Sequence, residues 1–185
     1  MAYVLHQLLI ESALRTPDKT AVVSGKNSLS YGELHTLTDQ LAGELRAQGV
    51  ASGDRVGIYV NKSLASIVSI FSILKAGACY VPLDPNAPVQ RLAYIIRDSG
   101  IKLLLTSTAR VANVQSMFPE DCPLQTIVLV DCDVPISSTL TTVSVPAEAT
   151  LVSWNEVCTR PALALPENLA IETDTAYILY TSGST

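Results

Sequence analysis

The sequence predicts an α/β protein whose mainly parallel sheet is covered by helices on both faces. From residue 55 to residue 130, short apolar runs alternate with stretches that carry apolar residues at helical spacing. Such strand–helix–strand units are right-handed and place helices against the sheet. The chain of 185 residues is long enough for one domain with a core. Only 16% of the residues are charged, against about 25% in an average domain. This composition predicts either a sheet-rich protein with a large buried core or a fragment whose apolar surface packs against further chain.

The first 50 residues predict a helix, a hairpin and a second helix. Residues 4–15 form the first helix, with one face made of Val4, Leu5, Leu8, Leu9 and Ser12. Two short strands, 20–24 and 27–30, flank Gly25-Lys26. Ser30-Tyr31-Gly32-Glu33 matches a capping box that starts the second helix. This helix should run to about Gln48 with four inward leucines, namely Leu34, Leu37, Leu41 and Leu45.

The alternating region follows. Its expected strands are 55–60, 79–83, 102–106 and 126–130, and its expected helices are 63–76, 88–98 and 108–118. Pro82 indicates that the second of these strands ends at a margin of the sheet or leads directly into a loop, because proline cannot donate a ladder hydrogen bond. On the helix 88–98, Val89, Leu92, Ile95 and Ile96 share one face.

The last third of the chain breaks this rhythm. Residues 135–150 are rich in Ser and Thr and predict an exposed loop, 153–157 a single helical turn, and 160–174 a linker. The apolar run Ala176 to Tyr180 predicts a buried strand. We therefore divide the chain into an α/β subdomain (1–134), a loop-rich linker (135–173), and the first strand and loop of a further subdomain (174–185).

Composition and charge exclude several classes of protein. The net charge of −5 argues against a nucleic-acid groove. Residues 111–175 hold nine acidic residues and one basic residue, which indicates a solvated face. The most apolar stretch, Leu64 to Leu74, is 11 residues long, whereas a membrane span needs roughly 20. The N-terminus lacks the basic cluster of a secretory signal, so we expect a cytoplasmic protein without membrane or nucleic-acid partners.

The cysteines and histidines do not predict a metal site. Cys79, Cys122, Cys132 and Cys158 form no C-x-x-C pair, and His6 and His35 lie far from them. Buried free thiols are expected, and Cys79 on an apolar strand should be inert. Neither histidine has an acidic partner at a suggestive spacing, so both are interpreted as surface residues.

The loop that follows the last apolar run is the main candidate site. Thr181-Ser182-Gly183-Ser184-Thr185 combines four hydroxyl groups with a glycine, which lets backbone N–H groups converge on an anion. No Gly-Lys-Ser/Thr follows, so the loop is not of Walker type. Gly49, Gly53 and Gly57 are spaced wrongly for a Rossmann fingerprint.

Three stretches, in order, resemble a known superfamily. They are Leu29-Ser-Tyr-Gly-Glu-Leu34, Leu74-Lys-Ala-Gly-Ala-Cys-Tyr-Val-Pro-Leu-Asp-Pro85 and Tyr180-Thr-Ser-Gly-Ser-Thr185. Together they resemble the first three core motifs of the AMP-forming adenylating enzymes. Arg91-Leu-Ala-Tyr94 and Asp98-Ser-Gly100 make the chain most similar to the amino-acid-activating branch. That branch contains adenylation domains of non-ribosomal peptide synthetases and stand-alone carrier-protein ligases, and acyl-CoA synthetases are close relatives.

The resemblance implies a reaction and a role for the loop. Such enzymes join an amino acid or other carboxylate to the α-phosphate of ATP, with Mg²⁺, and release pyrophosphate. They then pass the acyl group to a carrier-protein phosphopantetheine thiol or to coenzyme A. By resemblance, Thr181, Ser182, Gly183, Ser184 and Thr185 hold the departing phosphates, whose charge their donors stabilise. Tyr31, Glu33, Lys75 and Asp84 in the two earlier stretches are explained by capping, turns and packing.

The resemblance also sets a limit. In the family the loop continues into a Pro-Lys-Gly segment, and the carboxylate pocket, the Mg²⁺-binding acid and the catalytic lysine lie beyond it. The sequence carries none of these, so we expect the N-terminal part of the ligase large domain, inactive alone. Two alternatives stay open: a non-catalytic truncated or split product that acts as a packing partner, and an unrelated nucleotide-binding module.

Overall fold

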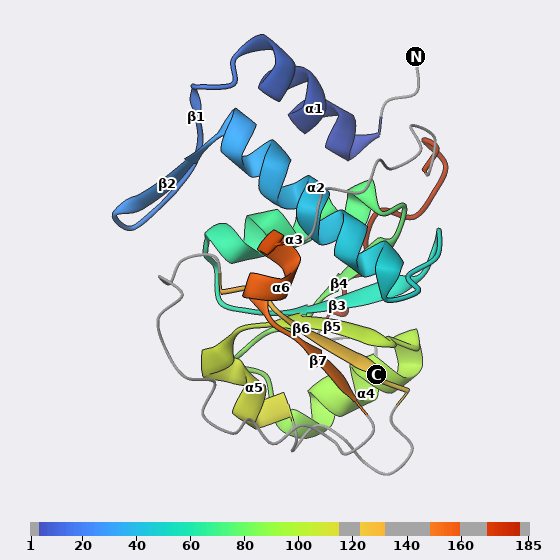
Figure 1. Ribbon diagram of the computed structural model, residues 1–185. Helices are drawn as coiled ribbons and strands as arrows, with labels where there is room; N and C mark the ends of the chain where they lie inside the picture. The colour runs from blue at the N-terminus through green and yellow to red at the C-terminus, as the bar shows by residue number, and fades with distance from the viewer. Residues whose placement is uncertain (1–3, 115–122, 132–148, 160–169, 182–185) are drawn as a thin grey trace.

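The computed structural model describes residues 4–114, 123–131, 149–159 and 170–181 (Figure 1). In chain order the elements are α1 (Leu5–Arg15), β1 (Thr20–Ser24), β2 (Asn27–Ser30), α2 (Tyr31–Ala47), β3 (Arg55–Tyr59), α3 (Leu64–Lys75), β4 (Cys79–Pro82), α4 (Val89–Ser99), β5 (Leu103–Thr106), α5 (Thr108–Val114), β6 (Thr126–Leu129), β7 (Thr150–Val152) and α6 (Trp154–Thr159). The last four residues of the predicted helix 108–118 lie outside the described chain.

Five strands form one parallel sheet in the order β4-β3-β5-β6-β7. The β1–β2 hairpin is a separate antiparallel pair. In the main sheet Gly57 lies opposite Val81 on one side and Leu104 on the other, which places β3 next to the edge strand β4. The α/β prediction is confirmed, and of the two alternatives for the strand that contains Pro82, its position at the margin of the sheet is observed.

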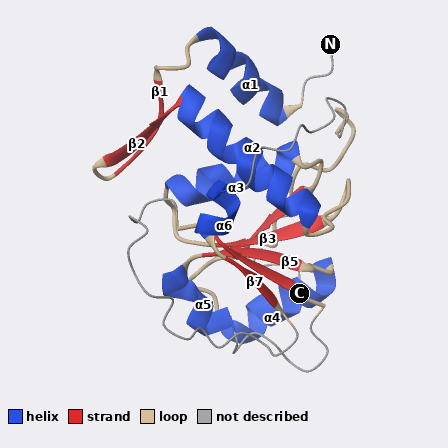
Figure 2. Cartoon of the chain, viewed as in Figure 1, coloured by secondary structure: helices blue, strands red, loops and turns tan. Residues whose placement is uncertain are grey.

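Helices cover both faces of the sheet (Figures 1 and 2). α2, α3 and α6 lie on one face, where their apolar residues join Val56, Ile58 and Val128 in a core. α4 and α5 lie on the other face with Leu104 and Ile127. α1 packs on the outside of α2 and α3 rather than on the sheet.

The helix boundaries follow local capping chemistry. The Ser30 hydroxyl accepts the Glu33 N–H at 3.2 Å, and the Glu33 carboxylate accepts the Ser30 N–H at 2.8 Å, which confirms the predicted capping box. Ser63 and Ser66 make the equivalent pair at the start of α3. α4 ends at Ser99 and is capped by Gly100, whose φ of 66° is left-handed.

Two parts of the fold differ from the sequence prediction. On α1 the buried residues are Leu9 and Ala13, whereas Leu5 and Leu8 are 47% and 58% exposed, because this helix contacts other helices along a narrow stripe. β7 is absent from the predicted strands, since it has only three residues. It lies with α6 in the segment predicted as a loop-rich linker, and the division of the chain at residues 134 and 173 stays a prediction.

Gly57 on β3 provides a test of how tightly the sheet packs against Ile101 and Leu104. A Cβ at this position would lie 2.7 Å from Leu104 Cδ1 and 3.3 Å from two Ile101 atoms. Overpacking of this kind costs about 1–3 kcal/mol. We expect Gly57→Val to lower the free energy of unfolding by that amount in urea titrations. Ser28→Val, which adds the same side chain at an exposed position of β2, should change it little. Equal stability of the two variants would contradict this packing.

Candidate functional site

Of the predicted phosphate loop, the described structure contains its first residue, Thr181. Ser182, Gly183, Ser184 and Thr185 lie outside the described residues, so their phosphate-binding role stays a prediction. Thr181 is exposed, and its carbonyl oxygen accepts a hydrogen bond from the Arg91 guanidinium at 3.0 Å. The loop therefore starts beside α4.

The segment before the loop is extended, but the prediction of a buried strand is wrong. Residues 176–180 form a single parallel bridge, between Tyr177 and Tyr80, instead of a ladder. Ile178 and Tyr180 pack against the core on the α4 face. Tyr177 and Leu179 point the other way and are 48% and 59% exposed. The segment is only half covered because β4 is its one neighbour among the described strands.

Backbone and ring contacts fix this segment to β4. The Tyr80 N–H donates to the Ala176 carbonyl at 3.1 Å, and the Ile178 N–H donates to the Tyr80 carbonyl at 3.1 Å. The rings of Tyr80 and Tyr177 lie 5.5 Å apart between centroids, a favourable spacing for an aromatic pair. The second stretch of the resemblance is thus a direct neighbour of the residues that lead into the third.

α4 makes a second contact with the segment. The Tyr180 hydroxyl donates to the Asp98 carboxylate at 2.5 Å. Burial, and then the hydrogen bond to Asp98, raise the pKa of Tyr180 to about 12, so the phenol stays a proton donor at neutral pH. Arg91 and Asp98 are seven residues apart, which puts them on one face of α4. Both residues belong to the stretches that carry the resemblance. The sequence analysis did not predict their contacts with Thr181 and Tyr180, although their spacing of seven residues indicated a shared helix face.

Lys75, in the second stretch, joins α3 to α2. Its ammonium group donates to Asp39 Oδ1 at 2.7 Å, to His35 Nδ1 at 2.7 Å and to the His35 carbonyl at 3.2 Å. An ammonium group only donates, so His35 Nδ1 must accept and the ring proton must reside on Nε2. Nε2 lies 3.5 Å from Asp39 Oδ2. The prediction of a surface histidine without an acidic partner is therefore wrong for His35.

The environment shifts the pKa values of this cluster. Burial lowers the pKa of Lys75, and its hydrogen bond to Asp39 opposes this. Burial and the nearby Lys75 charge lower the pKa of His35, against a smaller opposite effect of Asp39. His6 on α1 is half-buried, and burial and Lys75 lower its pKa as well. The neutral form of both imidazoles is favoured.

The described cysteines have the character of inert thiols. Cys79 is buried and free, and burial raises its pKa while Arg55 partly opposes the rise. Burial also raises the pKa of Cys158. A raised pKa leaves little thiolate at neutral pH. Cys122 and Cys132 lie outside the described residues. Within the described ranges, no His, Cys, Asp and Glu side chains gather in a group that could hold a metal ion.

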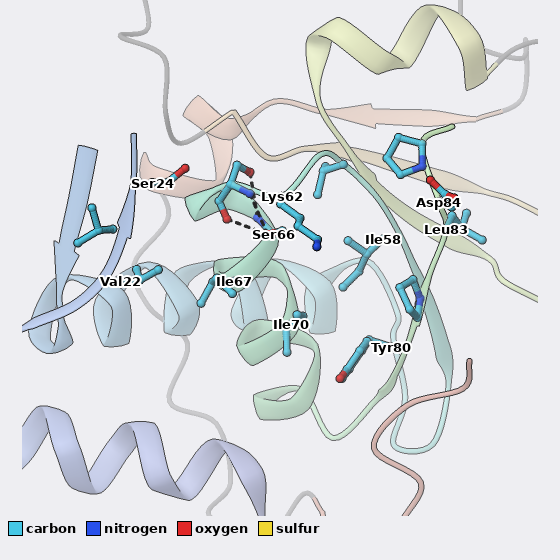
Figure 3. A pocket seen from close by; sticks show the side chains of 15 residues that line it. Val22, Ser24, Ile58, Lys62, Ser66, Ile67, Ile70, Tyr80, Leu83 and Asp84 are labelled. Atoms are coloured by element: carbon cyan, nitrogen blue, oxygen red, sulfur yellow. Dashed lines mark hydrogen bonds between the residues drawn. The ribbon is translucent and has the colours of Figure 1, made fainter. Parts of the chain in front are cut away.

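A cavity of about 750 Å³ opens beside β4, between the β1 strand, α3 and the ends of β3 and β4 (Figure 3). Its lining is mostly apolar and includes Ile58, Ile67, Ile70 and Tyr80. Ser63 and Ser66 line it too, but they bond to each other in the α3 cap. Asp84 Oδ1 accepts the Asn86 N–H at 2.9 Å and closes its own turn. The cavity thus offers mainly apolar surface.

Comparison with known proteins identifies the family. The model of the family described as AMP-binding enzyme matches residues 9–185. The chain belongs to this AMP-binding enzyme family. The resemblance drawn from the three sequence stretches is confirmed. In the part of the chain that the structure describes, no helix is both long and apolar enough to span a membrane.

Similar members of the family are much longer. The chain is 35% identical over 184 residues to bacitracin synthase 3 of Bacillus licheniformis, of which it covers 2%. It is 32% identical over 184 residues to syringomycin synthase SyrB1 of Pseudomonas syringae pv. syringae, of which it covers 25%. Both alignments take in 98% of this chain. Among solved structures, the non-ribosomal peptide synthetase FmoA3 in its AMPPNP-bound form matches with a TM-score of 0.73 and 26% identity, over 98% of this chain and 16% of that one.

The Lys75 cluster predicts a double-variant effect on stability. Asp39→Ala removes one hydrogen-bond acceptor from the Lys75 ammonium group, and the Lys75 side chain is only 3% exposed. This loss should cost about 1–3 kcal/mol of unfolding free energy. Lys75→Met fills the same space without a charge, and such replacements are often nearly neutral. We expect the Asp39→Ala/Lys75→Met double variant to be more stable in urea than Asp39→Ala alone. An additive loss would show that the two side chains are not coupled.

The histidines predict a pH dependence. The folded pKa of His35 lies below its unfolded value of 6.5, so the unfolded chain binds protons more readily. The stability contribution of neutral His35 is complete above pH 6.5 and is lost as the pH falls from there through the folded pKa. Urea midpoints at about pH 7.5 and about pH 5.5 should therefore differ less in His35→Gln than in the unaltered chain. His6→Gln provides a comparison with the second histidine whose pKa is lowered. If the difference between the two urea midpoints in His35→Gln equals that of the unaltered chain, the role of His35 is refuted.

Proposed function

We propose that this chain is the N-terminal part of an adenylation domain that activates a carboxylate, an amino acid or another acyl acid, as its acyl-adenylate. In this role Thr181 to Thr185 grip the departing phosphates of ATP, with Mg²⁺ bound to those phosphates. The acyl group is then transferred to the thiol of a carrier-protein phosphopantetheine arm or of coenzyme A. The described residues of this chain shape and hold the start of the phosphate loop.

One observation carries the proposal. β4 and α4, which contain the second stretch and its continuation, hold the backbone that leads into the loop. Tyr80 bonds to both Ala176 and Ile178, and Arg91 bonds to Thr181. A phosphate loop stabilises developing charge only if its donors are positioned before the reaction. The binding of AMPPNP by FmoA3 supports ATP as the nucleotide.

Pyrophosphate exchange tests this function. The 185-residue chain should show no ATP–pyrophosphate exchange with any amino acid. A chimera that continues this chain after Thr185 with the following part of SyrB1 should show amino-acid-dependent exchange. In that chimera Gly183→Val should reduce exchange at least about a hundredfold, because a side chain would block the approach of the backbone to the phosphates. Leu14→Val, an exposed change on α1, is the control.

The outcomes separate the proposal from its alternative. Exchange that survives Gly183→Val would contradict the assigned phosphate loop. A folded chimera without exchange would instead favour a non-catalytic packing partner. Exchange by the 185-residue chain alone would show that it needs no further chain.

A further inference from the structure

α1 is attached to the rest of the chain along a narrow stripe. It packs on the outside of α2 and α3 rather than on the sheet (Figure 1). Its buried residues are Leu9 and Ala13, whereas Leu5, Leu8 and Leu14 are exposed. An element with few buried apolar contacts opens at a lower free energy than the core of the same protein. α1 can therefore leave its place while the sheet stays folded.

The Lys75 cluster lies where α1, α2 and α3 meet. Lys75 belongs to α3, and His35 and Asp39 belong to α2. The Lys75 ammonium group donates to His35 Nδ1 at 2.7 Å and to Asp39 Oδ1 at 2.7 Å. His6 of α1 is half-buried, and the charge of Lys75 acts on it. With both imidazoles neutral, the cluster holds one positive and one negative charge.

A protonated His35 is incompatible with this arrangement. An imidazolium donates from both nitrogens, so Nδ1 can no longer accept a hydrogen bond from Lys75. Protonation also places a second positive charge beside an ammonium group whose side chain is only 3% exposed. His35 and Lys75 then compete for Asp39, whose Oδ2 lies 3.5 Å from His35 Nε2. Protonation of His6 as well leaves three positive charges against one carboxylate.

The other charged groups around α1 do not restore the balance. Glu11 and Arg15 of α1 itself have opposite charges and are both exposed. Glu172 and Asp174 line a small cavity of about 90 Å³ together with His6, and these two residues are exposed as well. Interactions with exposed charges are weakened by water and salt. The excess charge at the buried ammonium group is therefore relieved when the helices separate and water reaches it.

We propose that α1 is a pH-sensitive element of the fold, which is released from α2 and α3 when His35 and His6 become protonated. In the released state water reaches both imidazoles and the Lys75 ammonium group. Hydration and screening then reduce the repulsion among these groups. The proposal concerns the attachment of α1 and does not depend on the proposed function.

The direction of the effect follows from proton uptake. Burial and the Lys75 charge lower the pKa of both histidines below 6.5 in the folded chain. Well above pH 6.5 both imidazoles are neutral in either state, so the contacts of α1 are at full strength. As the pH falls from 6.5 through the folded pKa values, release takes up protons. The opening constant of α1 then rises by up to about tenfold per pH unit for each histidine.

Hydrogen exchange of the 185-residue chain tests the proposal. The amides of Leu9 and Ala13 report the opening of α1, and the amide of Leu104 on β5 reports the opening of the sheet. The rates are first corrected for the intrinsic pH dependence of exchange. The opening constant of α1 should then rise at least about fivefold between about pH 7.5 and about pH 5.5, because release takes up protons. At both pH values it should exceed the opening constant at Leu104.

Matched substitutions assign the effect to the two histidines. Glutamine stays neutral and keeps an oxygen that can accept from Lys75, so His35→Gln should lessen the rise of the opening constant. The His6→Gln/His35→Gln double variant should abolish it. Leu14→His adds an imidazole at an exposed position of α1 and should leave the rise unchanged. In the unaltered chain, an NMR titration of the imidazole protons should give midpoints below 6.5 for His6 and His35.

Several results would each overturn the proposal. An opening constant of α1 that is the same at both pH values would show that release takes up no protons. Equal opening constants at Leu9 and Leu104 would show that α1 opens only together with the sheet. A rise that persists in the double variant would assign the pH dependence to other groups. Imidazole midpoints at or above 6.5 would show that the attachment of α1 does not favour neutral histidines.

Discussion

Two hydrogen bonds at one residue, Tyr80, determine where the last described segment of the chain lies. β4 is the edge strand of the sheet, so one side of its backbone is free to bind Ala176 and Ile178. This pairing places the chain beside α4, where Tyr180 bonds to Asp98 and Arg91 reaches the carbonyl of Thr181. The open edge of β4 and the two α4 residues Arg91 and Asp98 together fix the start of the candidate phosphate loop.

The helices α2 and α3, which cover the sheet face opposite to α4, are joined by a buried charge with its hydrogen bonds. The three N–H donors of the Lys75 ammonium group meet three acceptors, two on His35 and one on Asp39. A buried charge is tolerated only when its donors are satisfied. The cluster therefore specifies how α2 and α3 sit against each other, which apolar contacts alone leave less defined. His6 brings α1 within reach of the same charge.

Much of this architecture could be predicted from the sequence, and the failures have physical causes. Periodicity located the strands and helices of the alternating region, because each buries a continuous apolar face. Periodicity did not predict β7, because three residues are too few to show an alternating pattern. It also predicted a buried strand for Ala176 to Tyr180, because an apolar run does not reveal that one face of the segment lacks a neighbour. The bonds of Lys75 and Arg91 link elements 36 to 90 residues apart in sequence, which no local pattern reports.

The order of the strands also implies an order of assembly. β3, β4 and β5 are near one another in sequence, so their pairing closes short loops. β7 and Tyr177 come much later in the chain and attach to opposite margins of the sheet, on β6 and β4. Closing the long loop between Tyr80 and Tyr177 costs more conformational entropy than the neighbouring pairings. β3, β4 and β5 can thus form a nucleus first, and the approach to the loop is added later in folding.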